Sequence, residues 1–138
     1  MKKHYVVGFL FSEDYSRIVL IRKNRPDWQA GLLNGLGGKI NLLDETPVTA
    51  MKREFKEESG VEVDNWKEFL KLEGEVSVVY FFIATGDTTK VTTIETEIVE
   101  SYDVATLKER LGACVPNLSW ILPLALTNDK FTGTINLG

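Results

Sequence analysis

Residues 37–61 read GGKINLLDETPVTAMKREFKEESGV and carry the strongest pattern in the chain. Two glycines lead into a short loop, and Thr46-Pro47 then offers a good start for a helix. Threonine caps the first free N–H groups of a helix, and proline lacks the N–H that the first turn leaves unpaired. Gly60 is a typical terminator. The stretch therefore predicts a helix that begins at Thr46-Pro47 and ends at Gly60.

The predicted helix has an anionic side and an apolar side. Glu54, Glu57 and Glu58 stand at positions i, i+3 and i+4, so their carboxylates project from one face. The adjoining face carries an apolar stripe that can pack on a core. This stripe consists of Val48, Met51 and Phe55.

Two interpretations explain such a dense group of carboxylates. In the first, the face binds a metal ion. The carboxylates repel one another unless a cation lies among them, and oxygen ligands of this kind suit Mg²⁺ when phosphates share its coordination shell. Alternatively, the acidic face is solvated and neutralised by Lys52, Arg53 and Lys56. The paired glycine in front favours the first interpretation, because it lets the backbone approach a ligand or metal without a Cβ in the way.

The same stretch resembles the Nudix box, G-x5-E-x7-R-E-U-x-E-E-x-G-U, where U is an aliphatic or otherwise bulky apolar residue. From Glu45 to Val61 every fixed position of the box is present. One departure precedes them, since six residues separate Gly38 from Glu45 where the box has five. The loop at 41–44 therefore carries an insertion, and the helix pattern is untouched.

Length, charge and cysteine content restrict the class of protein. The 138 residues suit a single domain over 1–138, and a net charge of −4 without a basic run argues against a nucleic-acid polymer as partner. Cys114 is the only cysteine, which excludes an intrachain disulfide and favours a reducing compartment. No apolar run reaches transmembrane length. We expect a cytoplasmic protein, monomeric or homodimeric, that does not associate with membranes.

Strand patterns and helix patterns alternate along the chain, which indicates α/β layers. Strands are expected at 5–11, 17–21, within 62–72, at 76–84 as a central strand, at 91–102 as an edge strand and at 131–137. Further helices are expected at 103–111, capped by Asp103, and at 118–126. The resemblance implies the Nudix-type α/β/α sandwich around a mixed β-sheet.

The resemblance also implies a metal-dependent reaction. It assigns Glu54, Glu57 and Glu58 as ligands of Mg²⁺, with Mn²⁺ as a substitute and the Gly38 carbonyl as an extra ligand. Arg53 stands four residues before Glu57 and can pair with it and orient it.

The general base is left open between helix and strand glutamates. Glu54 and Glu58 are two candidates, and family members also take a glutamate from the region that corresponds to 91–102. Glu97 is the preferred candidate there, with Glu95 and Glu100 as alternatives; each is also explained as a solvated strand residue.

Four side chains are candidates for substrate binding. Lys23 and Lys39 would meet phosphates, although the sequence by itself favours ordinary surface charge for Lys23. Asn34 belongs to a run, NGLGGK, that looks like the corresponding run of Nudix enzymes that clean oxidised purine nucleotides, where this asparagine touches the base. Asn117 resembles a second base-reading position of that branch. The alternatives are a turn asparagine and a helix N-cap, respectively. In the loop 24–33, Trp28 either caps the core or forms a base-stacking wall.

These features predict a Mg²⁺-dependent hydrolase of a nucleoside diphosphate linked to a further group. A purine nucleoside triphosphate, oxidised or not, is the favoured small-molecule substrate, giving the monophosphate and pyrophosphate. A nucleotide sugar or a dinucleotide polyphosphate is the alternative substrate. A nucleotide-binding sensor without turnover is the alternative class, and the intact Arg53-Glu54 and Glu57-Glu58 pairs argue against it.

Overall fold

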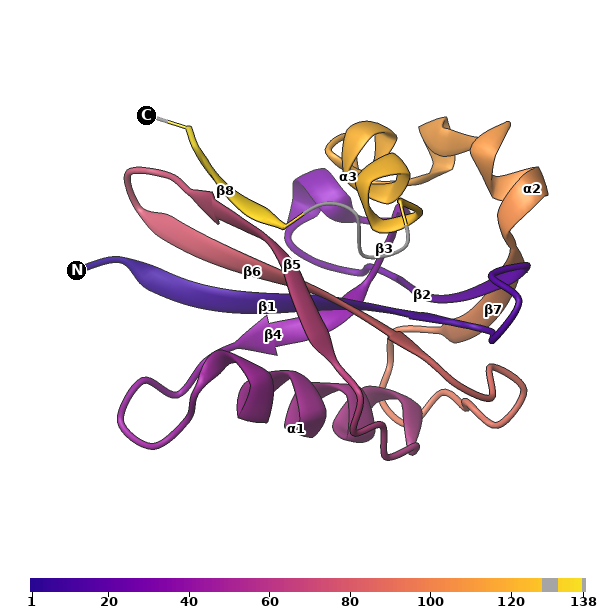
Figure 1. The fold of residues 1–138 in the computed structure, drawn as a ribbon, viewed down its shortest axis with the longest axis horizontal. Helices are drawn as coiled ribbons and strands as arrows, with labels where there is room; N and C mark the ends of the chain where they lie inside the picture. The colour runs from indigo at the N-terminus through magenta and orange to yellow at the C-terminus, as the bar shows by residue number, and fades with distance from the viewer. Residues whose placement is uncertain (128–131, 138) are drawn as a thin grey trace.

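A mixed β-sheet with helices on both sides forms the body of the chain (Figure 1). The computed structural model describes residues 1–127 and 132–137, and it confirms the expected α/β class. The strands are β1 (Lys3–Phe11), β2 (Arg17–Arg22), β3 (Leu33–Asn34), β4 (Leu36–Lys39), β5 (Lys67–Glu73), β6 (Ser77–Thr85), β7 (Val99–Asp103) and β8 (Gly133–Asn136). The helices are α1 (Pro47–Ser59), α2 (Val104–Lys108) and α3 (Leu118–Ala125), with short 3₁₀ turns η1 (Asp27–Gln29) and η2 (Leu111–Ala113).

The strand β6 is central, as its continuous apolar sequence predicts. The main path of the sheet runs β3-β2-β1-β6-β5-β8, while β4 pairs with β1 and β7 with β2. β1 and β6 run parallel, in register from Lys3 opposite Ser77 to Phe11 opposite Thr85. Strands that are covered on both faces have no polar face, which explains the apolar runs in β1 and β6.

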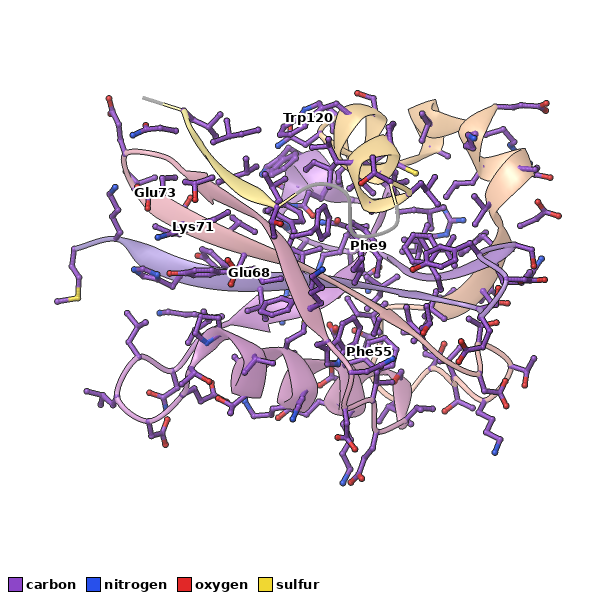
Figure 2. All side chains as sticks on the ribbon, viewed as in Figure 1. Phe9, Phe55, Glu68, Lys71, Glu73 and Trp120 are labelled. Carbon is purple, nitrogen blue, oxygen red and sulfur yellow. The ribbon has the colours of Figure 1, made fainter. Side chains whose placement is uncertain are left out.

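The sheet separates two apolar cores. Phe9 lies in the core beneath α3, whereas Phe55 of α1 lies in the core on the opposite side of the sheet (Figure 2). Alternate residues of β1 serve the two cores, because successive side chains of a strand point to opposite faces. Phe9 and Phe11 face α3, and Val6 and Leu10 face α1.

The helix α1 begins and ends where its sequence predicts. Thr46 caps it, accepting a bond from the Thr49 N–H at 3.3 Å, and the Thr49 hydroxyl accepts one from the Thr46 N–H at 2.9 Å. Gly60 ends it in the left-handed conformation, with φ of 77°. On the apolar side, Met51 and Phe55 are fully buried, so the predicted stripe anchors the helix to the sheet.

The prediction of one strand over 91–102 is wrong for its first part. Only β7, from Val99, pairs with the sheet, and residues 91–98 instead cross the end of α1. Thr92 donates its N–H to the Ser59 carbonyl at 3.0 Å, and the Thr93 hydroxyl accepts the Val99 N–H at 2.9 Å. The last carbonyls of a helix lack internal partners. They therefore bind this segment, which we call the crossing segment (residues 91–98).

The remaining predicted elements are present but shorter. α2 is capped by Asp103 as expected and ends at Lys108, after which η2 follows. The strand expected within 62–72 is β5, and the one expected at 131–137 is β8, whose first predicted residue lies outside the described part of the chain. None of the helices in the described residues is long and apolar enough to cross a membrane.

Candidate active site

The two glycines of β4 lie directly against the acidic face of α1. A Cβ built on Gly38 would lie 2.5 Å from the carboxylate of Glu54. Gly37 donates its N–H to Glu58 Oε1 at 2.9 Å, and a Cβ on Gly37 would overlap the carbonyl oxygen of Val6 in β1. The two glycines therefore let β4 lie against the carboxylates of α1 without an intervening Cβ, whereas the approach to a ligand or metal stays a prediction.

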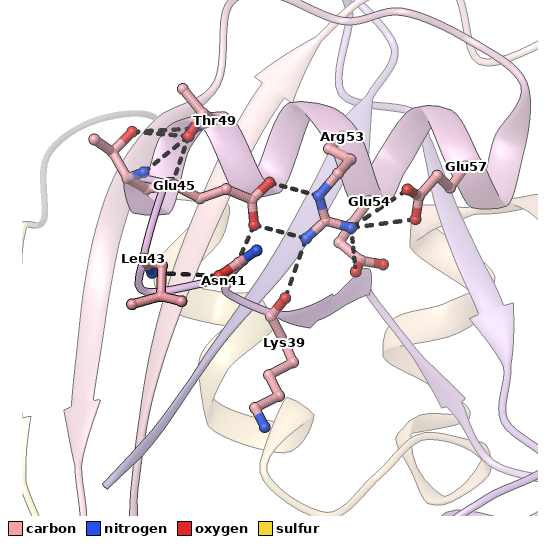
Figure 3. Close-up of polar contacts among 9 residues, drawn as sticks. Lys39, Asn41, Leu43, Glu45, Thr49, Arg53, Glu54 and Glu57 are labelled. Carbon is pink, nitrogen blue, oxygen red and sulfur yellow. Dashed lines mark hydrogen bonds and ion pairs between the residues drawn. The ribbon is translucent and has the colours of Figure 1, made fainter. Parts of the chain in front are cut away.

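Arg53 joins the carboxylates into a network (Figure 3). Its Nη1 donates to Glu54 at 2.8 Å and to Glu57 at 3.2 Å, which confirms the expected pairing with Glu57. Its Nε donates to Glu45 Oε2 at 2.5 Å, and its Nη2 donates to Glu45 Oε1 at 2.8 Å. Nη2 also donates to the carbonyl of Lys39 at 3.1 Å. One guanidinium therefore orients three carboxylates and ties α1 to the end of β4.

The inserted residue leaves Glu45 in a defined place. The Asn41 N–H donates to Glu45 Oε1 at 2.9 Å, and the Asn41 carbonyl accepts the Glu45 N–H at 2.8 Å. Between them the chain turns outward, with Leu43 fully exposed at its tip. Hydrogen bonds from Arg53 lower the pKa of Glu45. The insertion is accommodated as an outward bulge.

The helix carboxylates lie in an environment that opposes their negative charge. Burial, helped by the charge of the neighbouring Glu54, raises the pKa of Glu58 to about 8 against the opposing effects of Gly37 and Lys23. Burial also raises the pKa of Glu54, in spite of Arg53. Both groups would ionise more readily beside an additional cation.

The oxygen donors here suit a hard divalent cation, although their side chains do not form a complete ligand set. Among the described residues, no three Asp, Glu, His or Cys side chains converge closely enough to hold a metal ion. Glu54 and Glu57 both pair with Arg53, and the carboxylate of Glu57 is half exposed. Carboxylates and carbonyls match the preference of Mg²⁺ for oxygen ligands, so the chemistry of the set fits that ion.

A cleft of about 660 Å³ adjoins the same two glycines. It lies on the sheet face beneath α3, because Val79 and Phe81 of β6 line it together with Leu118 and Ile121 of α3. This volume is in the range of pockets that enclose a small molecule. Gly37 and Gly38, which contact Glu58 and Glu54, also line the cleft, although no residue of α1 does so itself.

Three of the four predicted substrate-binding residues line the cleft, although they are distant in sequence: Lys23, Asn34 and Asn117. Asn117 stands at the N-cap position of α3, but its side chain makes no capping hydrogen bond, so the interpretation of Asn117 as a cap is wrong. Lys39 does not line the cleft. Its carbonyl faces Arg53, and its side chain points away from the carboxylates (Figure 3).

The loop 24–33 contributes Trp28 and Gln29 to the cleft, and of these no sequence pattern identifies Gln29. Trp28 is 64% exposed, so the interpretation of Trp28 as a cap of the core is wrong, and it lines the cleft instead. Gln29, in η1, accepts a long bond of 3.4 Å from Asn34 Nδ2, while Asn34 Oδ1 accepts the Gly35 N–H at 2.8 Å. Only the tertiary fold brings these residues to Asn34.

The preferred strand glutamate, Glu97, lies in the crossing segment and faces the end of β2. It accepts a bond from Lys23 Nζ at 3.1 Å and one from the Asn24 N–H at 2.5 Å. Burial opposes its ionisation, but these bonds outweigh burial and lower its pKa. Glu95, two residues earlier, is the glutamate of this segment whose charge raises the pKa of both Glu54 and Glu58.

Comparisons with known proteins agree with this geometry. The family model described as NUDIX domain matches residues 1–118. No curated protein sequence matches the chain significantly.

A structure reported for MutT of Aliivibrio salmonicida and Vibrio cholerae superposes with a TM-score of 0.76 at 23% identity, covering 92% of this chain and 99% of that one. The mutator MutT protein of Bacillus halodurans gives 0.75 at 20% identity, with coverages of 97% and 89%. The NUDIX domain of Shewanella oneidensis NrtR, complexed with ADP ribose, gives 0.75 at 16% identity, with coverages of 92% and 88%. At these identities the structural likeness concerns the fold.

Proposed function

Because the chain belongs to the NUDIX domain family, we propose that it is a Mg²⁺-dependent hydrolase of a nucleoside diphosphate linked to a further group. One observation carries this proposal. Gly37 and Gly38 contact Glu58 and Glu54 on one side and line the cleft on the other. A molecule in the cleft would thus have one end at the acidic face of α1, where a metal and a phosphate chain would meet.

The roles of the acidic residues follow from their surroundings. Glu54, Glu57, Glu58 and the Gly38 carbonyl would hold Mg²⁺, or Mn²⁺ in its place. The bound ion would neutralise the phosphate chain and lower the pKa of a bound water. Arg53 orients Glu54 and Glu57 through the bonds of its Nη1. Proton acceptance would fall to Glu54, which is partly buried, or to Glu58, which is buried, on this face.

The favoured substrate is a purine nucleoside triphosphate, which would be cleaved to the monophosphate and pyrophosphate. Among the described residues that line the cleft, Lys23 is the only charged one, and Asn34, Gln29 and Asn117 offer neutral amides. An amide provides both a donor and an acceptor, as a purine edge requires. The neutral part of the cleft suits a base, and the phosphates would lie toward Lys23 and α1.

A second candidate is a binding module for an ADP-ribose-like ligand, without turnover. The similarity in fold to the NrtR domain complexed with ADP ribose motivates it. A pure binding module has no requirement for the complete set of Arg53, Glu54, Glu57 and Glu58, which this chain retains. We therefore favour the hydrolase.

A nucleotide panel with Mg²⁺, followed by phosphate and pyrophosphate release, tests the proposal. We expect pyrophosphate release to be fastest from a purine triphosphate. Asn34→Ala and Asn117→Ala should each lower kcat/KM for that substrate by about ten- to hundredfold, because a lost buried hydrogen bond costs about 1–3 kcal/mol. Pyrimidine triphosphates should be spared. Binding of ADP-ribose without release of any product would favour the second candidate.

A further inference from the structure

Lys23 and Glu97 form an ion pair at the edge of the cleft, although 74 residues separate them. Their Nζ and Oε1 atoms are 3.1 Å apart, and the two side chains are only 20% and 14% exposed. Lys23 follows the end of β2, where its N–H donates to the Leu32 carbonyl and its own carbonyl accepts the Gly31 N–H, both at 2.8 Å. The backbone that carries the ammonium group is therefore held from both sides.

Both oxygens of the Glu97 carboxylate are engaged with the segment that follows β2. Oε1 accepts from Lys23, and Oε2 accepts the Asn24 N–H at 2.5 Å. The crossing segment that carries Glu97 is itself fixed to the end of α1, through Thr92 and Ser59. Glu97 thus connects the end of α1 with the segment that places Lys23 in the cleft.

We infer that Glu97 is a positioning residue that holds the Lys23 ammonium between the cleft and the acidic face of α1, where Lys23 binds the phosphate chain. This inference rests on the proposed function. Lys23 lines the cleft together with Gly37, whose N–H donates to Glu58 Oε1 at 2.9 Å on the side of α1. A phosphate chain that runs from the cleft toward α1 would pass this ammonium group.

The geometry separates Glu97 from the roles of metal ligand and general base. Both oxygens of the Glu97 carboxylate accept hydrogen bonds, from Lys23 Nζ and from the Asn24 N–H, and neither donor belongs to α1. Removing the Glu97 charge should therefore affect phosphate binding through Lys23 and leave the metal requirement unchanged. A metal ligand or base would instead change the metal requirement or the turnover number.

A double-mutant cycle tests this inference, with KM, kcat and the Mg²⁺ concentration for half-maximal activity measured for each variant. Glu97→Gln keeps an oxygen for the Asn24 N–H and loses the charge beside Lys23. We expect Glu97→Gln and Lys23→Ala each to raise KM about tenfold, the effect of one charge-assisted hydrogen bond. The double variant should be no worse than Lys23→Ala alone, because Glu97 acts through Lys23. Neither the Mg²⁺ requirement nor kcat should change appreciably.

Glu73→Gln is the matched control, because Glu73 forms a comparable pair with Lys71 at 2.8 Å and neither residue lines the cleft. It should leave KM unchanged. Effects of Glu97→Gln and Lys23→Ala that multiply in the double variant would overturn the inference. A large loss of kcat or a shifted Mg²⁺ requirement in Glu97→Gln would do the same.

Binding of inorganic pyrophosphate with Mg²⁺, measured by calorimetry, separates this inference from the proposed function. A wild-type protein that hydrolyses no nucleotide refutes the proposed function alone. In that case pyrophosphate should still bind about tenfold more weakly to Glu97→Gln, with no further loss in the double variant relative to Lys23→Ala. Equal affinity of the wild type and Glu97→Gln, or no binding to the wild type, would overturn the inference.

Discussion

Gly37→Ala and Gly38→Ala should damage the protein in different ways, although the two residues are adjacent. The methyl group of Gly37→Ala would overlap the carbonyl oxygen of Val6 and lie 2.7 Å from its carbonyl carbon. Val6 belongs to β1, which is paired with β4 on one side and β6 on the other, so its backbone has little freedom to move. The methyl group of Gly38→Ala would meet only the carboxylate of Glu54, at the flexible end of a side chain.

The distances give the size of each effect. An ordinary Cβ contact begins at 3.4 Å, so a Glu54 atom at 2.5 Å must retreat by about 0.9 Å in Gly38→Ala. Misplacing a catalytic group by about 1 Å costs roughly a hundredfold in rate. In Gly37→Ala the backbone must shift instead, and overpacking of a rigid site costs about 3 kcal/mol. That free energy corresponds to roughly 10 °C in Tm for a domain of this size.

Thermal unfolding followed by circular dichroism and kcat/KM at saturating Mg²⁺ separate the two outcomes. Gly38→Ala should melt near the wild type and lose about a hundredfold in kcat/KM, whereas Gly37→Ala should melt about 10 °C lower. Gly112→Ala is the control, because a Cβ there has no atom within 4 Å. A fully active Gly38→Ala would show that catalysis does not depend on the position of Glu54, and an unchanged Tm in Gly37→Ala would refute the rigidity of β1.

Three further results are expected. A chelator should abolish hydrolysis, and Mg²⁺ or Mn²⁺ should restore it. Glu57→Gln should reduce turnover by orders of magnitude without lowering Tm, because the Glu57 carboxylate is half exposed. Full activity in the chelator would contradict the metal site. Because burial raises the pKa of Glu58 from 4.5 to about 8, the folded state binds more protons than the unfolded state between these values. The metal-free protein should therefore lose stability to urea as pH rises through that range, more steeply than Glu58→Gln, and equal slopes would contradict the shift. Deletion of Leu43, which is fully exposed in the bulge, should change neither Tm nor kcat/KM appreciably, and lost turnover in a folded variant would show that the longer loop serves the substrate.

The part of the site on α1 was predictable from sequence, because it depends on interactions between residues that are close in the sequence. Thr46 and Gly60 set the limits of α1 through hydrogen bonds to residues within one helical turn, and Pro47 suits the first turn because it lacks an N–H. The spacing of Glu54, Glu57 and Glu58 places them on one face of any helix. The pairing of Arg53 with Glu45 was not predictable in the same way, because Glu45 lies before the helix and reaches Arg53 only through the turn at Asn41.

The crossing segment shows where local pattern and tertiary structure compete. Its alternating sequence favours a strand, but the end of α1 offers unpaired carbonyls, and Thr92 binds one of them. This competition turns residues 91–98 away from the sheet and brings Glu97 to Lys23. No periodicity within the segment carries that information, because the partner groups lie in α1 and after β2.

The cleft depends almost wholly on such long-range placement. Trp28 and Gln29 come from an irregular loop, and Asn117 comes from the start of α3, yet they line the same cavity as Asn34. The chemistry at α1 requires only an anionic phosphate chain and a cation, so it does not distinguish one nucleotide from another. Discrimination must arise where a base would contact neutral amides. Asn34 Oδ1 already accepts the Gly35 N–H, and Asn34 Nδ2 donates one of its hydrogens to Gln29 Oε1. Under the proposed function, Gln29 would therefore take part in base recognition by Asn34, and the choice of substrate would follow from how the loop 24–33 and α3 fold over the sheet.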